Sequence, residues 1–151
     1  MNDPKVISVK KEQLTLEGIS QYYIHTETDK LKYDAITDLY ETIIINQLII
    51  YCNTKQRVIY LTNNLHNDGF TCACIHSELT TKERMSIMQD FRKGDIRVLI
   101  STDLLARGID VQQVSLVINY DLPRNIETYI HRIGRSGRYG RKGFALNFIS
   151  K

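Results

Sequence analysis

Two spacings of apolar residues alternate along this chain. Short continuous or alternating apolar runs are typical of strands, and apolar residues that recur every three or four positions are typical of helices. The predicted strands are Ile19–Glu27, Gln47–Cys52, Phe70–Ile75, Arg97–Ser101, Val114–Tyr120 and Gly143–Ile149. The predicted helices are Asp29–Ile43, Lys55–Asp68, one that opens after Thr80 and runs through Arg92, and one that follows Asn125. Such alternation favours right-handed crossovers, so we expect an α/β, doubly wound, mainly parallel sheet with helices on both faces.

Two of these helices carry capping residues at their starts, and one of them also carries a stop signal. Thr28 or Asp29 can cap the first helix. Thr80, with Glu83 three residues later, can form a capping box, and Gly94 is well placed to end that helix. The side chains of this helix that we expect to face the core are Met85, Met88 and Phe91.

The last predicted helix is followed closely by arginines. Asn125 can cap it, and one face carries the apolar residues Ile126, Tyr129, Ile130 and Ile133. The opposite face is expected to carry Glu127, Thr128, His131 and Arg135. Gly134 and Gly137 can let the helix unwind, so that Arg135 and Arg138 converge on one point outside it. Planar guanidinium groups suit phosphate oxygens, although a solvated basic helix end is the common alternative.

The size and composition are those of one globular domain. The chain has 151 residues, of which 42% are hydrophobic and 25% charged. No apolar run approaches the roughly 18 residues of a membrane span, and the charged stretch Met1–Lys11 is unlike a signal peptide. We therefore expect a cytoplasmic or nuclear monomer without membrane contact, with residues 1–17 as a lead-in and 18–151 as the domain. The net charge of +3 is compatible with nucleic acid without indicating it.

The three cysteines do not form a convincing metal site. Cys72 and Cys74 alternate at strand spacing, and the third, Cys52, stands alone. A Cys-x-Cys pair on a strand lacks the turn that wraps thiolates round zinc, and no second pair is present. Small buried side chains are therefore the favoured interpretation, and no metal is assigned.

A second polar segment, Ser101–Asp110, follows a predicted strand. The Thr102 hydroxyl and free backbone donors at the strand end can hold a nucleic-acid phosphate. Asp110 can accept from a ribose hydroxyl or pair with Arg138 and orient it. The alternative is a capped turn with a structural pair between Arg107 and Asp110.

Taken together, these segments resemble the DEAD-box RNA helicases of helicase superfamily 2, in their C-terminal RecA-like lobe. The resemblance rests on His131–Arg138 (HRIGRSGR), Thr102–Asp110 with its Thr-Asp and Ala-Arg-Gly-Ile-Asp parts, and Ile49–Thr54, in which Tyr51 stands where Phe is usual. Leu14–Ile19 and Asp110–Pro123 resemble the eukaryotic translation initiation factor 4A group and its nuclear relative in particular. The likeness covers nearly the whole chain.

The resemblance implies a role for each matching residue. Arg135 and Arg138 would act as arginine fingers on the ATP γ-phosphate, and His131 would link the nucleotide and RNA sites. Gly108 and Asp110 would lie near the ribose and phosphates. Residues expected at the RNA backbone are Asn53, Thr54, Arg84 and Thr102. The chain departs from the family at Thr81, where Gln is usual, and at His76-Ser77-Glu78, where the family has His-Gly-Asp.

The segments that bind ATP most directly in this family are not in the sequence. No G-x-x-x-x-G-K-[ST] phosphate loop and no Asp-Glu-Ala-Asp segment occurs, so ATP with Mg²⁺ is expected mainly on a separate N-terminal lobe. The chain alone is expected to be inactive, with RNA, that lobe and a scaffold protein as partners. The alternative is an RNA- or scaffold-binding module without turnover. A dinucleotide-binding fold would need G-x-G-x-x-G after the first strand, which is not found.

Overall fold

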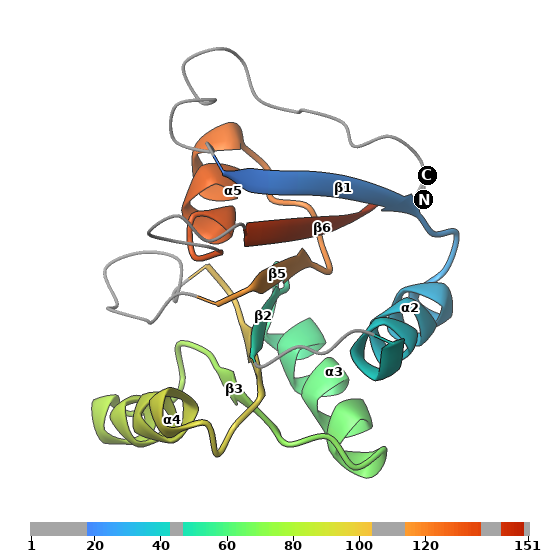
Figure 1. Ribbon diagram of the computed structural model, residues 1–151. Coiled ribbons are helices and arrows are strands. Elements are labelled where there is room, and N and C mark those ends of the chain that lie inside the picture. The colour runs from blue at the N-terminus through green and yellow to red at the C-terminus, as the bar shows by residue number, and fades with distance from the viewer. Residues whose placement is uncertain (1–17, 43–46, 104–113, 137–142, 150–151) are drawn as a thin grey trace.

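The structure of the protein is a computed structural model that describes residues 18–42, 47–103, 114–136 and 143–149 (Figure 1). Its strands are β1 (Ile19–His25), β2 (Leu48–Tyr51), β3 (Cys72–Ile75), β4 (Val98–Ser101), β5 (Leu116–Asn119) and β6 (Gly143–Ile149). Its helices are α2 (Asp29–Thr42), α3 (Lys55–Asn67), α4 (Thr81–Lys93) and α5 (Ile126–Ile133). The predicted elements are confirmed, with ends that shift by one or two residues. The lead-in segment 1–17 and the residues Arg107, Gly108, Asp110, Gly137 and Arg138 lie outside the described residues.

The described strands form one parallel sheet in the order β1-β6-β5-β2-β4-β3. Every pairing among them is parallel, including β1 with β6 along all seven residues. Tyr51 at the end of β2 pairs with Ser101 on one side and Asn119 on the other. The carboxyl ends of these three strands are therefore level, and the loops that follow them start from one edge of the sheet.

Helices cover both faces of the sheet, as the sequence predicts, because alternate residues of the central strands point into two separate cores. Ile50 and Ile118 pack with α2 and α3, whereas Ile49 and Val117 pack with α4 and α5. In Figure 1, α2 and α3 lie to the right of the strands, and α4 and α5 to the left. Each of β2, β4 and β5 is buried along its full length, which explains why these strands read as continuous apolar runs.

Side-chain caps set the helix starts as predicted. The Thr28 hydroxyl accepts from the Leu31 amide, and Thr80 and Glu83 form the reciprocal capping box, with donor–acceptor distances of 2.8 and 3.1 Å. Asn125 accepts from the Thr128 amide at 2.8 Å. Gly94 ends α4 with φ of 88°, a left-handed conformation that favours glycine.

Two predictions about side-chain direction are wrong. Met85 is exposed on α4, because a three-residue spacing drifts round the helix axis and places Met85 about 120° from the buried Phe91. On α5 the inward face is turned from the predicted one. Ile126 is exposed, and the buried residues are Thr128, Tyr129, Arg132 and Ile133. Gly134 keeps a right-handed conformation (φ of −62°), so the helix ends without the predicted unwinding at this position.

None of the helices in the described ranges is long and apolar enough to cross a membrane.

The two methionines of α4 test which face of this helix supports the fold. Met88 is 5% exposed in the core and Met85 is 59% exposed. Met88→Ala should lower the free energy of unfolding by about 2–5 kcal/mol, because it leaves a cavity. Met85→Ala, the matched control on the same helix, should change it by less than about 0.5 kcal/mol. Urea denaturation of the chain measures both, and equal losses would contradict this assignment of the buried face.

Candidate nucleic-acid and nucleotide interface

The polar residues of the site collect at the carboxyl edge of the sheet. Asn53 and Thr54 follow β2, Thr102 and Asp103 follow β4, and Asp121 follows β5. Helix α3 starts at this edge, with Thr54 as its N-cap. Helix N-termini carry partial positive charge and free amides, so a site of this kind suits anions.

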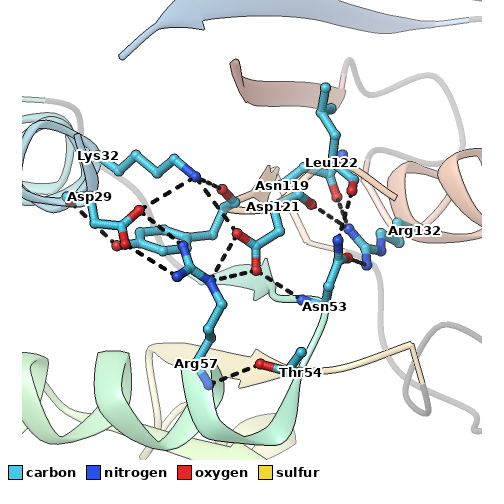
Figure 2. A network of polar contacts seen from close by, with 10 residues as sticks. Asp29, Lys32, Asn53, Thr54, Arg57, Asn119, Asp121, Leu122 and Arg132 are labelled. Atoms are coloured by element: carbon cyan, nitrogen blue, oxygen red, sulfur yellow. Dashed lines mark hydrogen bonds and ion pairs between the residues drawn. The ribbon is translucent and has the colours of Figure 1, made fainter. Parts of the chain in front are cut away.

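A single arginine of α5 holds the three loops together. Arg132 is 0% exposed. Its Nε donates to the Asp103 carboxylate at 2.5 Å, and one Nη donates to Asn53 Oδ1 at 2.6 Å. The other Nη donates to Asn119 Oδ1 at 3.0 Å and to the Asp121 carbonyl at 2.7 Å. Figure 2 shows this guanidinium against Asn53, Asn119 and Asp121. A buried charge is tolerated only when its donors are satisfied, so these loops must take up positions that satisfy them.

The arrangement of Asn53 follows from these contacts. Its side-chain oxygen accepts from Arg132, and its Nδ2 donates to the Leu122 carbonyl at 2.9 Å. Its backbone amide donates to the Asp121 carboxylate at 2.9 Å. The residue remains exposed, with one amide hydrogen directed away from the bonds described. Asn53 is therefore fixed in place at the surface of the site.

A pair of cations, Arg57 on α3 and Lys32 on α2, neutralises the Asp121 carboxylate. The Arg57 guanidinium binds Asp121 through Nε at 2.9 Å and Asp29 through its Nη atoms at 3.0 and 3.2 Å (Figure 2). Lys32 is buried and donates to the Tyr120 carbonyl at 2.9 Å. Arg57 lowers the pKa of the Asp29 carboxyl, and that carboxyl raises the pKa of Arg57. The carboxylates of this edge are thus paired within the protein, which reduces their repulsion of an anionic ligand.

The predicted RNA-backbone residues have separate surroundings. The exposed Thr54 uses its hydroxyl oxygen to accept from the Arg57 amide at 3.2 Å, which leaves its hydroxyl hydrogen for a further bond. Thr102 is half-buried next to Asp103. Arg84 is half-buried on α4, and its buried Nε has no hydrogen-bond partner. The structure brings Asn53 and Asp103 together through Arg132, but within the described ranges it shows no hydrogen bond or ion pair from Arg84 to either residue.

The predicted phosphate-side residues lie further along α5. His131 is exposed and Arg135 is half-buried. The Arg135 carbonyl accepts from the Val114 amide at 2.9 Å, and Ser136 forms a parallel bridge with Val114. Because Val114 precedes β5, the Arg135 backbone lies near the amino end of that strand. Asp110 and Arg138 are four and two residues along the chain from this bridge.

Tyr51 belongs to the core beside α4 and α5 and also contacts the Arg132 guanidinium. Its ring lies below the Arg132 guanidinium, 5.3 Å from centroid to Cζ, at a distance suited to a cation–π contact. Its hydroxyl is buried without a hydrogen-bond partner. Burial raises the pKa of this hydroxyl, and the charges of Arg135 and Arg132 oppose the shift. Cys52, next along the chain, is buried, and burial raises the pKa of its thiol to about 12, so it is unreactive.

Metal ligands do not gather in the part of the chain that the structure describes. No group of three His, Cys, Asp or Glu residues is placed to hold an ion there. Cys72 and Cys74 pack against the α2 and α3 core.

The most connected residue of the site was not predicted from the sequence. No role was assigned to Arg132, although it lies three residues after Tyr129 and four after Thr128, on the buried face of α5. Asn119 and Asp121 were also missed. The spacing from Tyr129 was the available signal, since residues three and four apart share a helix face.

Comparison with known proteins assigns the chain to a family. The helicase conserved C-terminal domain model matches residues 31–140. The chain is 60% identical over 150 residues to ATP-dependent RNA helicase eIF4A of Kluyveromyces lactis, and 59% identical to ATP-dependent RNA helicase fal1 of Aspergillus oryzae. Each alignment covers 99% of this chain and 38% of the relative, so the chain spans well under half the length of these curated relatives.

Solved structures agree. The C-terminal domain of the DEAD-box protein Dbp5 superposes with a TM-score of 0.81 at 42% identity, over 90% of this chain and 79% of that one. S. cerevisiae Dbp5 L327V bound to RNA and ADP BeF3 superposes with a TM-score of 0.85 at 39% identity, over 95% of this chain and 38% of that one. The fold and the family match define a helicase C-terminal domain. The chain belongs to the helicase conserved C-terminal domain family, among the DEAD-box proteins, and is similar to the eIF4A and fal1 helicases.

Removal of the Arg132 guanidinium tests its structural role. Arg132→Met keeps a long side chain but leaves the acceptors of Asp103, Asn53 and Asn119 without their donor. The free energy of unfolding should fall by about 3–5 kcal/mol, as when one partner of a buried ion pair is lost. Arg124→Met, which removes an exposed arginine, should cost less than about 0.5 kcal/mol. A loss in Arg132→Met no larger than in Arg124→Met would contradict the role assigned to the guanidinium.

Proposed function

We propose that this chain is the second lobe of an ATP-dependent RNA helicase of the eIF4A type, which contacts RNA at the carboxyl edge of its sheet and ATP through the end of α5. The observation that carries the proposal is the fully buried Arg132, which joins the loops after β2, β4 and β5 to α5. Arg135 is one turn further along the same segment. One rigid unit therefore carries candidate groups for both ligands.

On the RNA side, the groups suit the sugar-phosphate backbone rather than base edges. Asn53, Thr54 and Thr102 offer amide and hydroxyl donors, and Arg84 offers a guanidinium whose buried Nε lacks a partner. Uncharged donors and arginines of this kind position a backbone without reading sequence. We therefore infer that RNA binds with little sequence preference and with a clear dependence on salt. Dbp5 has been solved with RNA and ADP BeF3, which supports the same ligands here.

On the nucleotide side, Arg135 and Arg138 are proposed as the arginine fingers, with His131 beside them and Gly108 and Asp110 at the ribose and phosphates. The half-buried Arg135 fits this role, because a partly dry guanidinium interacts strongly with phosphate oxygens. Its backbone bond to Val114 fixes the end of α5 against β5.

ATP with Mg²⁺ is the proposed cofactor, held mainly by a separate N-terminal lobe. When bound, it supplies the phosphoanhydride whose hydrolysis drives the cycle. In this lobe the described residues offer arginines for the phosphates but no cluster of three metal ligands. Ligands shared by two lobes favour the closed arrangement by their extra affinity for it, so ATP and RNA each strengthen binding of the other.

The partner set is also part of the proposal. The N-terminal lobe and RNA are required by this mechanism, and a scaffold protein is a further candidate, since Dbp5 has been solved with Gle1 and with Nup159. The likeness to eIF4A favours a cytoplasmic location for the protein, and the likeness to fal1 also allows a nuclear one. The second candidate function is an RNA- or scaffold-binding module without turnover, which the lack of a G-x-x-x-x-G-K-[ST] phosphate loop in this sequence favours.

Loss of the first arginine finger tests the helicase proposal. The chain is joined behind the N-terminal lobe of the Kluyveromyces lactis relative, and RNA-stimulated ATP hydrolysis is measured. Arg135→Ala should lower turnover by about 10³ to 10⁵, the usual worth of an arginine finger. RNA binding without nucleotide should persist, because the groups proposed at the RNA are unchanged.

The control is Arg92→Ala, which removes an exposed arginine from the last turn of α4 and should leave turnover unchanged. Near-normal hydrolysis in Arg135→Ala would overturn the arginine-finger role. A joined wild-type protein that binds RNA and never hydrolyses ATP would favour the binding module instead.

A further inference from the structure

A chain of buried hydrogen bonds runs from the edge strand β1 to Arg132. The Tyr22 carbonyl accepts from Asn147 Nδ2 at 3.1 Å, and Asn147 Oδ1 accepts from Asn119 Nδ2 at 2.7 Å. Asn119 Oδ1 in turn accepts from the Arg132 guanidinium at 3.0 Å. The side chains of Asn119, Asn147 and Arg132 are all 0% exposed. Three neighbouring strands and α5 are thus joined by one polar path through the core.

The direction of this path is fixed at both ends. A backbone carbonyl such as that of Tyr22 can only accept, and a guanidinium such as that of Arg132 can only donate. Two amides in series satisfy both ends only if each turns its nitrogen toward β1 and its oxygen toward α5. A flip of either amide would place two donors or two acceptors together in a site closed to water, at a high cost in free energy.

Tyr129 forms a side branch of the same path. Asn147 Nδ2 donates to the Tyr129 hydroxyl at 3.0 Å, and that hydroxyl donates to Gln21 Oε1 at 2.8 Å. The branch gives the second Nδ2 hydrogen of Asn147 an acceptor, and it makes no hydrogen bond to Arg132. It therefore offers an internal control that shares the burial and the chemistry of the main path.

We propose that Asn147 and Asn119 are positioning residues, whose fixed amide direction holds the Arg132 guanidinium toward Asn53 and Asp103 and so sets the geometry of the RNA-side loops. They touch no ligand. Their influence reaches the site through Arg132, the shared hydrogen-bond partner of Asn119, Asn53 and Asp103. The effect on turnover rests on the proposed helicase function, whereas the effect on Arg132 does not.

The test removes the Nδ2 donor of Asn147. Asn147→Asp keeps the shape, but its ionised form cannot donate to the Tyr22 carbonyl. Burial raises the pKa of a carboxyl, so at low pH the new group is protonated and regains one donor and one acceptor. The groups around it are the Tyr129 hydroxyl on α5, the Tyr22 carbonyl on β1 and Asn119 on β5, with the Arg132 charge beyond.

The measurement is hydrogen exchange of the Arg132 Nε–H by NMR in this chain, as a ratio to wild type at the same pH. At about pH 8 the exchange in Asn147→Asp should be roughly fivefold to tenfold faster, as the loss of one hydrogen bond implies. At about pH 5.5 the ratio should return toward one. Asn63→Asp, at an exposed site on α3, should stay near one at both pH values.

Two further variants exclude a purely structural effect. Tyr129→Phe removes the branch and should leave Arg132 exchange near the wild-type rate, although it destabilises the same core. If Asn147→Asp does not fold, Asn147→Ser replaces it. Its short hydroxyl spans only part of the path, and exchange should be faster at both pH values.

The proposal is overturned if Arg132 exchange is unchanged in the Asn147 variants, or if Tyr129→Phe accelerates it equally. It is also overturned if Asn147→Asp accelerates exchange without recovery at low pH. Turnover of the joined two-lobe protein gives the second readout. If wild type does not hydrolyse ATP, the helicase proposal fails while the NMR result still decides the role of Asn147.

Discussion

The structure depends most on the burial of one guanidinium. Arg132 is withdrawn completely from water, and a buried charge is costly unless its donors are satisfied. The partners are a carboxylate, two side-chain amides and a backbone carbonyl, from the segments after β2, β4 and β5 and from β5 itself. None of these loops can move far without leaving the charge unpaired. The loops at this edge are therefore held in position before any ligand arrives.

The parallel sheet makes this arrangement available. Level pairing of β2, β4 and β5 brings their carboxyl ends to one edge, which is where ligands commonly bind in open α/β sheets. Helix α5 has only eight residues, so few apolar contacts can hold it, and its inward face is half polar. Its attachment through Arg132 and through the backbone bond between Val114 and Arg135 compensates for this. Groups proposed for RNA and for ATP thus sit on one short, firmly anchored helix and the loops that it touches.

Much of the fold could be predicted from the sequence, because local signals and the global fold agree. The Thr80–Glu83 capping box, the Gly94 stop and the continuous apolar strands each describe a feature that depends on neighbours in the chain. The motifs also gave the correct family. Side-chain direction was harder, since a small drift round a helix axis moves a residue from the core to the surface. Met85 has the right spacing from Met88 for a core position but lies too far round the helix from Phe91.

The role of Arg132 could not be predicted in the same way. An arginine is rarely buried, and nothing local shows that acceptors 11 to 79 positions away will surround it. The sequence does not indicate the role of Asn119 and Asn147 either, because it depends on a hydrogen bond between two strands, from residues 28 positions apart. The residues proposed at the ATP ribose and phosphates, Gly108, Asp110 and Arg138, rest on their sequence motifs and the family resemblance. Long-range polar contacts are thus the part of this site that only the structure reveals.

The most direct test of the account is a double-mutant cycle between Asn53→Ala and Asp103→Ala, with the free energy of unfolding measured in urea. The two residues come from different loops and share the Arg132 guanidinium. We expect the double variant to lose less than the sum of the single losses, with a coupling of about 0.5–3 kcal/mol. A control cycle of Asn53→Ala with Asp95→Ala, before β4 at the opposite edge, should be additive. Additivity within about 0.5 kcal/mol for Asn53 and Asp103 would contradict the claim that one buried arginine organises the site.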